Sequence, residues 1–447
     1  MKPKIKVLLI AYNFPPFIRA SSMRTFGWFE NFSDDIEVTV VTRKWDKNIV
    51  YGVTNYFQED EKGVDVEIVN SWKKIIRVPN RYNNYFKIKN FKIIRILKLN
   101  KLFTFLELLL RWLPVFYIDN ERSLYVEAKN QLKLENFDWV ITSGEPFVLF
   151  KYALLLKKKF GVKISLDYRD GFSTNTIKNM SPNFLESLTI KLDRIFERKV
   201  LIKSDLVTFV SEKLKSEIEK DVINLKKKNT LIVNNGIDFF TFDETLNKQV
   251  EKILDKTFFN LIFVGTLYEG HNVAMFLSAI ENLIVKENCK IKVTFVGSIL
   301  TIPDFHMQHL KKFQNLFPEN IYLQDYIENS LVRCLQKNAD LLLKFNAFEQ
   351  HEGHFGKKMY EYALSGRKVI SINHKPTFNN KLNFFDHKPF IYYCNNSEEI
   401  FITIKQFYDL WAIGFSINNE IEVDELSVFS TENQVKKLEK KLLISTK

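Results

Sequence analysis

The 447-residue sequence predicts an α/β protein built from two consecutive Rossmann-like domains, for three reasons. The length exceeds what one compact core normally holds. Continuous apolar runs such as KVLLIAY (6–12) and FNLIFVGTL (259–267) are typical of strands buried on both faces of a parallel sheet. Helix-like stretches separate these runs, and the alternation restarts after a polar segment at 241–256, which predicts a second domain of the same class.

The first half of the chain alternates strands and helices. The predicted strands cover 6–12, 37–43, 64–70, 137–144, 162–170, 204–211 and 229–238. The predicted helices cover 21–32, a stretch shortly before 137, 147–161 and about 183–203. Three lysines near the end of FVLFKYALLLKKKFG (147–161) and the final Gly161 are typical of a helix C-terminus.

The second half repeats the scheme and ends in a helix. The predicted strands cover 259–267, 290–298, 321–326, 339–345, 366–372 and 390–394. The predicted helices cover 272–286, 329–338, a stretch from about Gly356, and 430–443, where Val435, Leu438 and Leu442 share one face. We therefore expect domains at 1–240 and 241–428, and a C-terminal helix at 429–447 that packs back toward the first domain.

Composition excludes several classes of protein. Hydrophobic residues make up 46% and charged residues 26%, so a disordered or fibrous chain is excluded. The three cysteines form no C-x-x-C pair, which argues against a disulfide framework and favours a reducing compartment. No run of 18 uncharged apolar residues predicts a spanning helix, and the N-terminus resembles a first strand more than a signal peptide. We expect a cytoplasmic protein, either soluble or bound to a membrane surface.

The positive charge is confined to the first half. Residues 1–240 hold 41 Lys and Arg against 28 Asp and Glu, whereas 241–447 hold 24 against 25. Ten of these bases lie between Lys73 and Lys101, interleaved with apolar and aromatic residues and without an acid. This pattern favours an anionic membrane surface, with nucleic acid a weaker alternative. The residues expected to face the membrane are Lys87, Lys89, Lys92 and Arg95. The alternative is a solvated helix pair whose apolar residues belong to the core.

The loops that follow the predicted strands are where open α/β sheets bind ligands. Gly265 and Gly297 end two such strands. The stretch EGHFGKKMYEYALSGRKVI (352–370) places a Gly-containing loop before a helix whose N-terminus carries Lys357 and Lys358. First-turn lysines are unfavourable without an anion, so this stretch predicts a diphosphate site. The alternative is a surface pair of lysine with Glu361 on an ordinary helix.

Eight short motifs in order resemble those of GT-B-fold nucleotide-sugar glycosyltransferases of family 4, in the branch that builds bacterial surface polysaccharides. The motifs are YNFPP (12–16) with Ser21, Ser22 and Arg24, VTVVTRKWD (38–46), SGEP (143–146), DYRD (167–170), KSDLVTFVS (203–211), NNGID (234–238), FVGTL (263–267) and GKKMYEYALSGRKVI (356–370). The resemblance implies that 1–240 binds an acceptor and that 241–428 binds a nucleotide sugar.

The resemblance also implies a donor site. Glu361 matches the second Glu of the family's Glu-x7-Glu motif, which binds the donor ribose, and Lys358 matches its lysine. Other implied donor contacts are Gly265, Thr266, His271, His354, Phe355, Gly356 and Lys357, with Arg19 a possible diphosphate contact. Three positions depart from the family. The first motif Glu is replaced by Gly353, and Thr266 and His271 stand where relatives carry an Arg and a Lys.

The implied reaction is sugar transfer, with retention, from a nucleoside-diphosphate sugar to a lipid-linked or growing saccharide in surface-glycan synthesis at the inner membrane face. The first domain has no His, so we expect Asp170, and secondarily Glu145, to orient or deprotonate the acceptor hydroxyl. Asp170 could instead pair with Arg169 or cap a helix. His351 and His354 do not form H-E-x-x-H, and we expect no metal or other cofactor. The alternatives are a degenerate GT-B scaffold or partner subunit, and a sugar-nucleotide epimerase.

Overall fold

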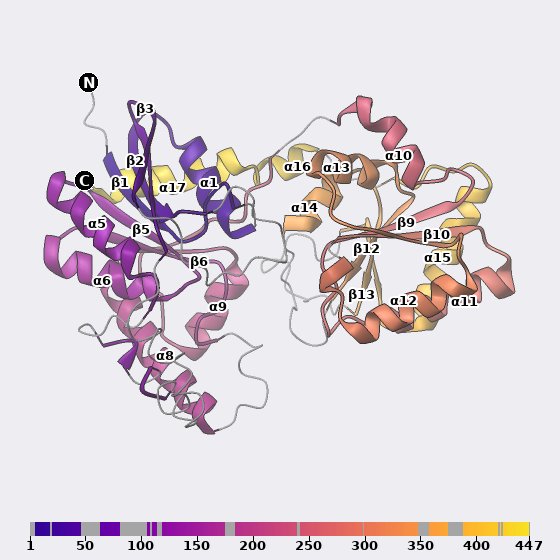
Figure 1. Ribbon diagram of the computed structural model, residues 1–447, viewed down its shortest axis with the longest axis horizontal. Coiled ribbons are helices and arrows are strands. Elements are labelled where there is room, and N and C mark those ends of the chain that lie inside the picture. The colour runs from indigo at the N-terminus through magenta and orange to yellow at the C-terminus, as the bar shows by residue number, and fades with distance from the viewer. Residues whose placement is uncertain are drawn as a thin grey trace. The chain divides into compact units, whose positions relative to one another are not determined.

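Figure 1 shows the computed structural model of the chain, which divides into two compact units. The first unit combines Met1–Gly236 with Phe429–Lys447, and the second is Ile237–Val428. The structure describes residues 5–17, 20–45, 63–80, 105–107, 110–113, 119–174, 184–238, 242–297, 299–346, 357–373, 388–418, 421 and 423–446.

The first unit contains an eight-stranded sheet in the order β3-β4-β2-β1-β5-β6-β7-β8. All neighbouring strands are parallel except β3 and β4, which pair antiparallel at one edge. The strands are β1 (Ile5–Ala11), β2 (Ile36–Arg43), β3 (Asp65–Asn70), β4 (Lys73–Val78), β5 (Trp139–Gly144), β6 (Lys163–Tyr168), β7 (Leu206–Phe209) and β8 (Thr230–Ile232). The predicted parallel sheet is confirmed, and its inner strands are apolar because both faces are covered.

The start of the basic segment is a strand. Lys73–Val78 forms β4, which pairs with β2, so the interpretation of this segment as a helix pair is wrong for these residues. Ile75 and Ile76 are buried, and β-branched side chains of this kind favour a strand. Lys73 Nζ donates to Glu30 O at 2.6 Å, so this base is already engaged within the unit. The remaining seven bases lie outside the described residues.

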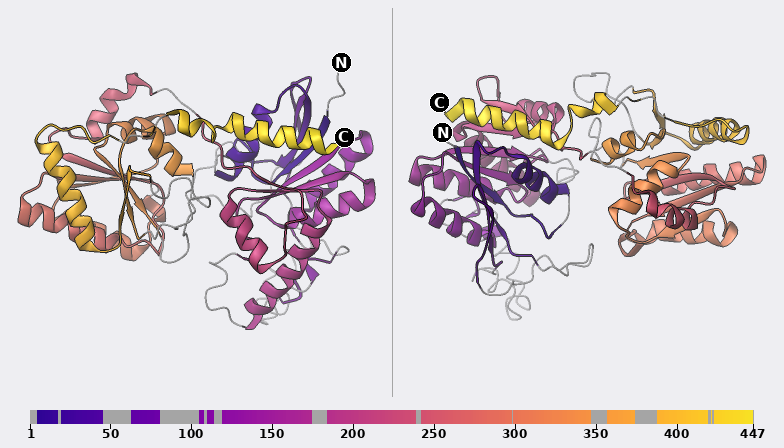
Figure 2. Two further views of the ribbon diagram at one scale, coloured as in Figure 1. Left: turned by 180° about the vertical axis from the view of Figure 1, so that it is seen from behind. Right: turned by 90° about the horizontal axis from the view of Figure 1, so that it is seen from above.

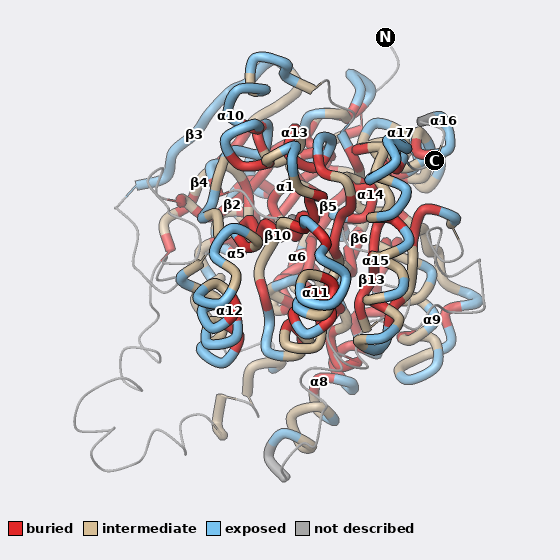
Figure 3. The backbone as a smooth tube through the Cα atoms, turned by 90° about the vertical axis from the view of Figure 1, so that its right-hand side faces the viewer, coloured by how far each residue is buried: buried red, intermediate tan, exposed pale blue. Residues whose placement is uncertain are grey.

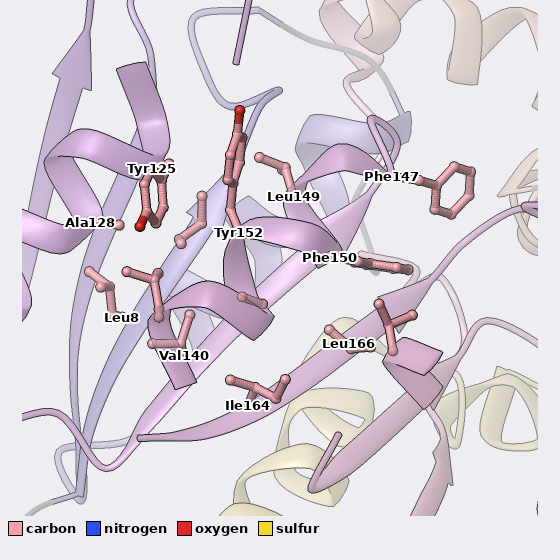
Figure 4. Packing of buried hydrophobic residues seen from close by; sticks show 14 of the residues in the cluster. Leu8, Tyr125, Ala128, Val140, Phe147, Leu149, Phe150, Tyr152, Ile164 and Leu166 are labelled. Carbon is pink, nitrogen blue, oxygen red and sulfur yellow. The ribbon is translucent and has the colours of Figure 1, made fainter. Parts of the chain in front are cut away.

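Helices pack on both faces of this sheet and form two hydrophobic clusters, one of which is shown in Figure 4. The helices are α1 (Ala20–Asn31), α5 (Arg122–Leu134), α6 (Val148–Phe160), α8 (Phe184–Lys203), α9 (Glu212–Asp221) and α17 (Thr431–Thr446). Gly161, with a φ of 74°, ends α6 as expected. The apolar face of α17 is fully buried in the same cluster as Trp28 and Trp139, so the final helix packs on the first unit beside α1 (Figure 2).

The second unit contains an all-parallel six-stranded sheet in the order β11-β10-β9-β12-β13-β14. The strands are β9 (Phe259–Val264), β10 (Ile291–Val296), β11 (Ile321–Gln324), β12 (Leu341–Phe345), β13 (Val369–Ile372) and β14 (Ile391–Cys394). The helices are η1 (Glu244–Leu246), α10 (Asn247–Ile253), α11 (Val273–Glu287), η2 (Ile299–Thr301), α12 (Asp304–Leu316), α13 (Asn329–Asn338), α14 (Lys357–Leu364), α15 (Ser397–Ala412) and α16 (Val423–Ser427).

Burial follows this layered arrangement, with buried strands inside and exposed residues on the outer helix faces (Figure 3). Each unit has its own apolar core, as the two separate alternations in the sequence predict. No described helix combines the length and the apolar character that crossing a bilayer requires. The loops after the parallel strands lie together at the carboxyl edge of each sheet, which is where the candidate sites are found.

Candidate functional sites

The second unit holds a glycine-lined site at the end of β9. Gly265 has a φ of +133°, and a Cβ at this position would lie 1.7 Å from Lys358 Nζ. A Cβ at Gly297, after β10, would lie 2.3 Å from Gly265 O. Both positions therefore require glycine, and the space that a side chain would fill at residue 265 is taken by the lysine ammonium.

Lys358 lies in the first turn of α14, where the helix N-terminus is electrostatically positive. Its Nζ also lies 5.4 Å from the ring centroid of Phe263. The residue keeps contact with solvent, yet protein atoms crowd the ammonium, and this burial lowers its pKa to about 8 against the attraction of Glu361. A crowded cation of this kind is well suited to bind an anion from solution.

Tyr362 fixes α14 on the sheet. Its buried hydroxyl donates to Leu343 O of β12 at 3.1 Å and accepts from Val264 N of β9 at 3.3 Å. Val264 directly precedes Gly265, so the same side chain positions the end of β9 and the helix that carries Lys358. Glu361, next to Tyr362, is half-buried and near enough to Lys358 to influence its charge.

Two histidines hold the loop that follows Gly265. His271 Nδ1 accepts from Tyr268 N at 3.2 Å, and His306 Nε2 donates to Tyr268 O at 3.0 Å. His271 is buried and stacks on Phe345, so in this structure it supports the loop from its buried side. Its role in donor binding stays a prediction, as does that of the half-buried Thr266. No sequence pattern points to His306, because its partner is a backbone carbonyl 38 positions earlier.

Several predicted site residues cannot be placed. Lys357 begins α14, but its side chain is not described. The others lie outside the described residues, and they are Arg19, Lys87, Lys89, Lys92, Arg95, His354, Phe355 and Gly356. Among the residues that are described, no group of three or more metal-binding side chains is found.

The first unit holds a buried ion pair at the carboxyl edge of its sheet. Asp167, fully buried at the end of β6, accepts from Arg24 Nε at 3.0 Å and from Arg24 Nη2 at 2.8 Å. Ser143 Oγ and Thr208 Oγ1 donate to the same carboxylate at 2.8 and 2.7 Å. Arg24 Nη1 also donates to Asn234 O at 3.0 Å. Four of the motifs quoted above therefore meet at one carboxylate, and its role is to join them.

Arg169 and Asp170 follow Asp167 in the loop after β6. Arg169 Nε donates to Gly144 O at 2.6 Å, and burial lowers its pKa while the charge of Asp170 opposes this effect. Asp170 and Glu145 are both exposed at the same edge, and both carboxylates act on the charge of Arg169. The structure thus brings the two predicted catalytic carboxylates to one guanidinium, and their catalytic roles stay predictions.

A second buried carboxylate, Glu197 on α8, was missed by the sequence analysis. It is fully buried and accepts from Ser173 N at 3.1 Å and from Ser173 Oγ. A signal existed in the sequence, because Glu197 lies three and four residues before Val200 and Leu201, which are also buried. Glu197 therefore shares their face of the helix. Within a sequence so rich in charged residues, it is easily taken for a solvent-exposed acid.

Comparisons with known proteins identify the fold. No protein-family model and no curated protein sequence matches the chain. Sucrose-phosphate synthase from Thermosynechococcus elongatus is similar in structure, with a TM-score of 0.57 and 13% identity over 99% of this chain and 94% of that one. Anabaena HepE in complex with UDP has a TM-score of 0.61 and 10% identity over 98% and 100%.

The catalytic domain of starch synthase IV from Arabidopsis thaliana, bound to ADP and acarbose, has a TM-score of 0.57 and 10% identity over 99% of each chain. These likenesses extend over both units, and each unit has the parallel sheet of a Rossmann-like domain. The chain therefore has the GT-B fold.

Proposed function

We propose that this protein is a glycosyltransferase that moves a sugar from a nucleoside-diphosphate sugar to a saccharide acceptor. The observation that carries the proposal is the position of the Lys358 ammonium, held over Gly265 at the N-terminus of α14. Similar solved structures are complexes with UDP, UDP-glucose and ADP, which supports a nucleotide-sugar donor here.

The chemical demand of this reaction falls on the leaving group. Breaking the bond between the sugar and the diphosphate leaves a developing negative charge, which must be stabilised as it forms. Lys358 provides a positive charge that Tyr362 and α14 hold in place, so little reorganisation is needed when the bond breaks. The helix N-terminus adds backbone N–H groups and a positive partial charge. Glu361, one turn further on, offers two carboxylate oxygens for the neighbouring hydroxyls of a ribose.

On the acceptor side, we propose that Asp170 orients or deprotonates the attacking hydroxyl, with Glu145 as the second candidate. Their exposure at the carboxyl edge supports access by an acceptor. Replacing Asp170 by Asn is expected to lower turnover on the order of 100-fold or more, the usual size for a lost general base.

The finer assignment rests on the motif resemblance. It comprises family 4, retention of configuration, a lipid-linked or growing acceptor, and a part in bacterial surface-glycan synthesis at the inner face of the membrane. The excess of bases over acids in residues 1–240 supports an acceptor delivered from an anionic surface.

Nucleotide binding tests the donor site. We expect UDP, GDP or ADP to raise the melting temperature, and Glu361→Ala to abolish this protection. Lys358→Ala should weaken binding of UDP roughly tenfold to a hundredfold but leave uridine nearly unaffected, because a lost contact to a charged group removes this much affinity. Lys311→Ala and Glu319→Ala change exposed residues of the second unit and serve as matched controls. Unchanged nucleotide affinity in both site variants would show that the site is wrongly assigned.

Assays of nucleotide release from sugar nucleotides, with and without an acceptor, distinguish the alternative functions. A transferase releases nucleotide from a sugar nucleotide faster when an acceptor lipid or saccharide is present. An epimerase converts the sugar nucleotide without acceptor and releases no nucleotide, whereas a degenerate scaffold binds nucleotide without turnover.

A further inference from the structure

We propose that Glu197 is a positioning residue that holds the loop carrying Asp170 in its working conformation. The proposal rests on the proposed function only for the catalytic meaning of Asp170, because the contacts that hold the loop are visible in the structure itself. Glu197 lies on α8 and is fully buried, and it has no place in the reaction described above.

The loop after β6 is anchored on both sides of Asp170. On one side, Arg169 Nε donates to Gly144 O at 2.6 Å. On the other side, Ser173 donates to Glu197 Oε2 from both its backbone nitrogen, at 3.1 Å, and its hydroxyl. Only Asp170, Gly171 and Phe172 lie between these anchors, so the position of the Asp170 backbone is set by both of them.

Aromatic packing makes the second anchor rigid. Phe172, next to Ser173, is buried and stacks on Phe147 with ring centroids 4.5 Å apart. Trp112 meets Phe172 edge to face at 5.3 Å and stacks on Phe196 of α8 at 4.2 Å. The loop therefore has little freedom to find another partner if the carboxylate of Glu197 is changed.

The charge of Glu197 is unfavourable for folding where it stands. Burial raises its pKa to about 7, opposed chiefly by the two Ser173 donors. Asp193, one turn earlier on α8, raises the pKa further, and Asp193 Oδ1 is itself bonded to Trp112 Nε1 at 2.7 Å. Tyr168 of β6 lies near enough to favour the charged form, although the two side chains miss hydrogen-bond geometry.

The sign of the resulting pH dependence follows from the raised pKa. The folded protein holds the Glu197 proton more tightly than the unfolded chain, so this group stabilises the fold at low pH. That contribution is lost as pH rises from the ordinary value of 4.5 through about 7. The ionised carboxylate is the stronger acceptor for Ser173, because charge-assisted hydrogen bonds are roughly twice as strong as neutral ones. The loop is therefore held best at the pH where Glu197 is least favourable for stability.

This opposition separates positioning from a purely structural role. Glu197→Gln keeps the shape of the side chain and an acceptor oxygen but removes the charge. We expect it to raise the melting temperature at pH 8, with the gain shrinking toward pH 5, and to lower turnover at pH 8 by on the order of tenfold. If Glu197 had only a structural role, Glu197→Gln would lower both the stability and the activity of the protein.

Hydrogen exchange of the loop amides tests the anchor without a substrate. We expect protection of residues 169–174, relative to unstructured peptides, to fall on the order of tenfold between pH 8 and pH 6 in the wild type. In Glu197→Gln this protection should be lower and independent of pH over the same range. Glu186→Gln, the same change at an exposed position of α8, is the matched control and should behave as the wild type.

The pH profile of nucleotide release, with UDP-glucose as the probe and with the other sugar nucleotides that protect the protein thermally, completes the test. Turnover of the wild type should fall as the pH drops through an apparent pKa near 7. Glu197→Gln should not show this fall. Exchange that is equal in wild type and variant at pH 8 would overturn the proposal, as would unchanged turnover. Absence of turnover in every protein, with the exchange result as expected, would instead overturn the proposed function and leave the anchor standing.

Discussion

At the level of single residues, Gly265 and Lys358 depend on each other. The ammonium of Lys358 occupies the volume that any side chain at position 265 would need, 1.7 Å from a Cβ. The strand-end glycine and the first-turn lysine, 93 positions apart, are thus two parts of one structural element. A short G-T-L turn in the sequence reveals the need for glycine but not its reason.

We predict that Gly265→Ala weakens UDP binding at least tenfold, because the new methyl group displaces the ammonium that binds the diphosphate. The protein should also lose about 1–2 kcal/mol or more of its free energy of unfolding, since a φ of +133° is accessible essentially to glycine alone. Thermal shift with UDP and urea unfolding measure the two effects.

Gly161→Ala is the matched control for this prediction. Gly161 also has a positive φ, of 74°, but no atom lies within 4 Å of a Cβ added there. It should therefore lose stability and keep UDP affinity. Equal UDP affinity in both variants would contradict the assignment of the Lys358 ammonium to the diphosphate.

At the level of secondary structure elements, Asp167 joins the strand ends of the first unit. Its carboxylate binds side chains from α1, β5 and β7 and itself belongs to β6. Both members of the ion pair are almost fully buried, with side-chain exposures of 1% for Arg24 and 0% for Asp167. Breaking such a pair leaves an uncompensated charge in the interior, which is far more costly than losing a pair at the surface.

We predict that Arg24→Ala lowers the free energy of unfolding by about 3–5 kcal/mol, as for other broken buried pairs. Adding Asp167→Asn to this variant should restore part of the loss, because the remaining buried charge is removed. Urea unfolding of the single and double variants measures the coupling.

Lys405→Ala provides the exposed comparison. It breaks the Lys405–Asp409 pair on α15, whose members are 28% and 56% exposed, and should change stability by less than about 1 kcal/mol. A similar small loss for Arg24→Ala would mean that the pair does not hold the strand ends together.

At the level of the whole molecule, charge is distributed unevenly along the chain. The first 240 residues carry the entire excess of bases, and the described bases of β4 are engaged within the first unit. The membrane prediction therefore concerns the bases further along the segment, which lie outside the described residues. Each base within a Debye length of an anionic leaflet contributes about 1 kcal/mol to the free energy of membrane binding.

We predict that the protein floats with anionic liposomes at low salt, that high salt releases it, and that neutral liposomes bind little. Changing Lys87, Lys89, Lys92 and Arg95 to Glu should abolish flotation and leave UDP affinity unchanged. A second variant with Lys226, Lys227, Lys311 and Lys312 changed to Glu carries the same charge change at exposed positions elsewhere. Equal flotation of both variants and the wild type would show that the segment does not bind membranes.

The sequence by itself determined the two parallel sheets and the amphipathic final helix. Continuous apolar runs such as Ile5–Ala11 and Phe259–Val264 specify strands covered on both faces, and the spacing of Val435, Leu438 and Leu442 specifies a helix with one buried side. These are local patterns, so they can be read without knowing the neighbours. The lysine-rich start of β4 was wrongly interpreted as part of a helix pair, because three charged residues flank its two buried isoleucines.

Only the tertiary structure decided which polar residues meet. Arg24 and Asp167 are 143 positions apart, Lys358 lies over Gly265, and Glu197 turns inward beneath the loop of Asp170. The sequence suggested a ligand at the strand ends, yet it singled out Asp170 and overlooked Glu197. The reason is physical: whether a carboxylate is a solvated acid or a buried acceptor depends on which helix packs over it, and that packing joins residues that no local pattern connects.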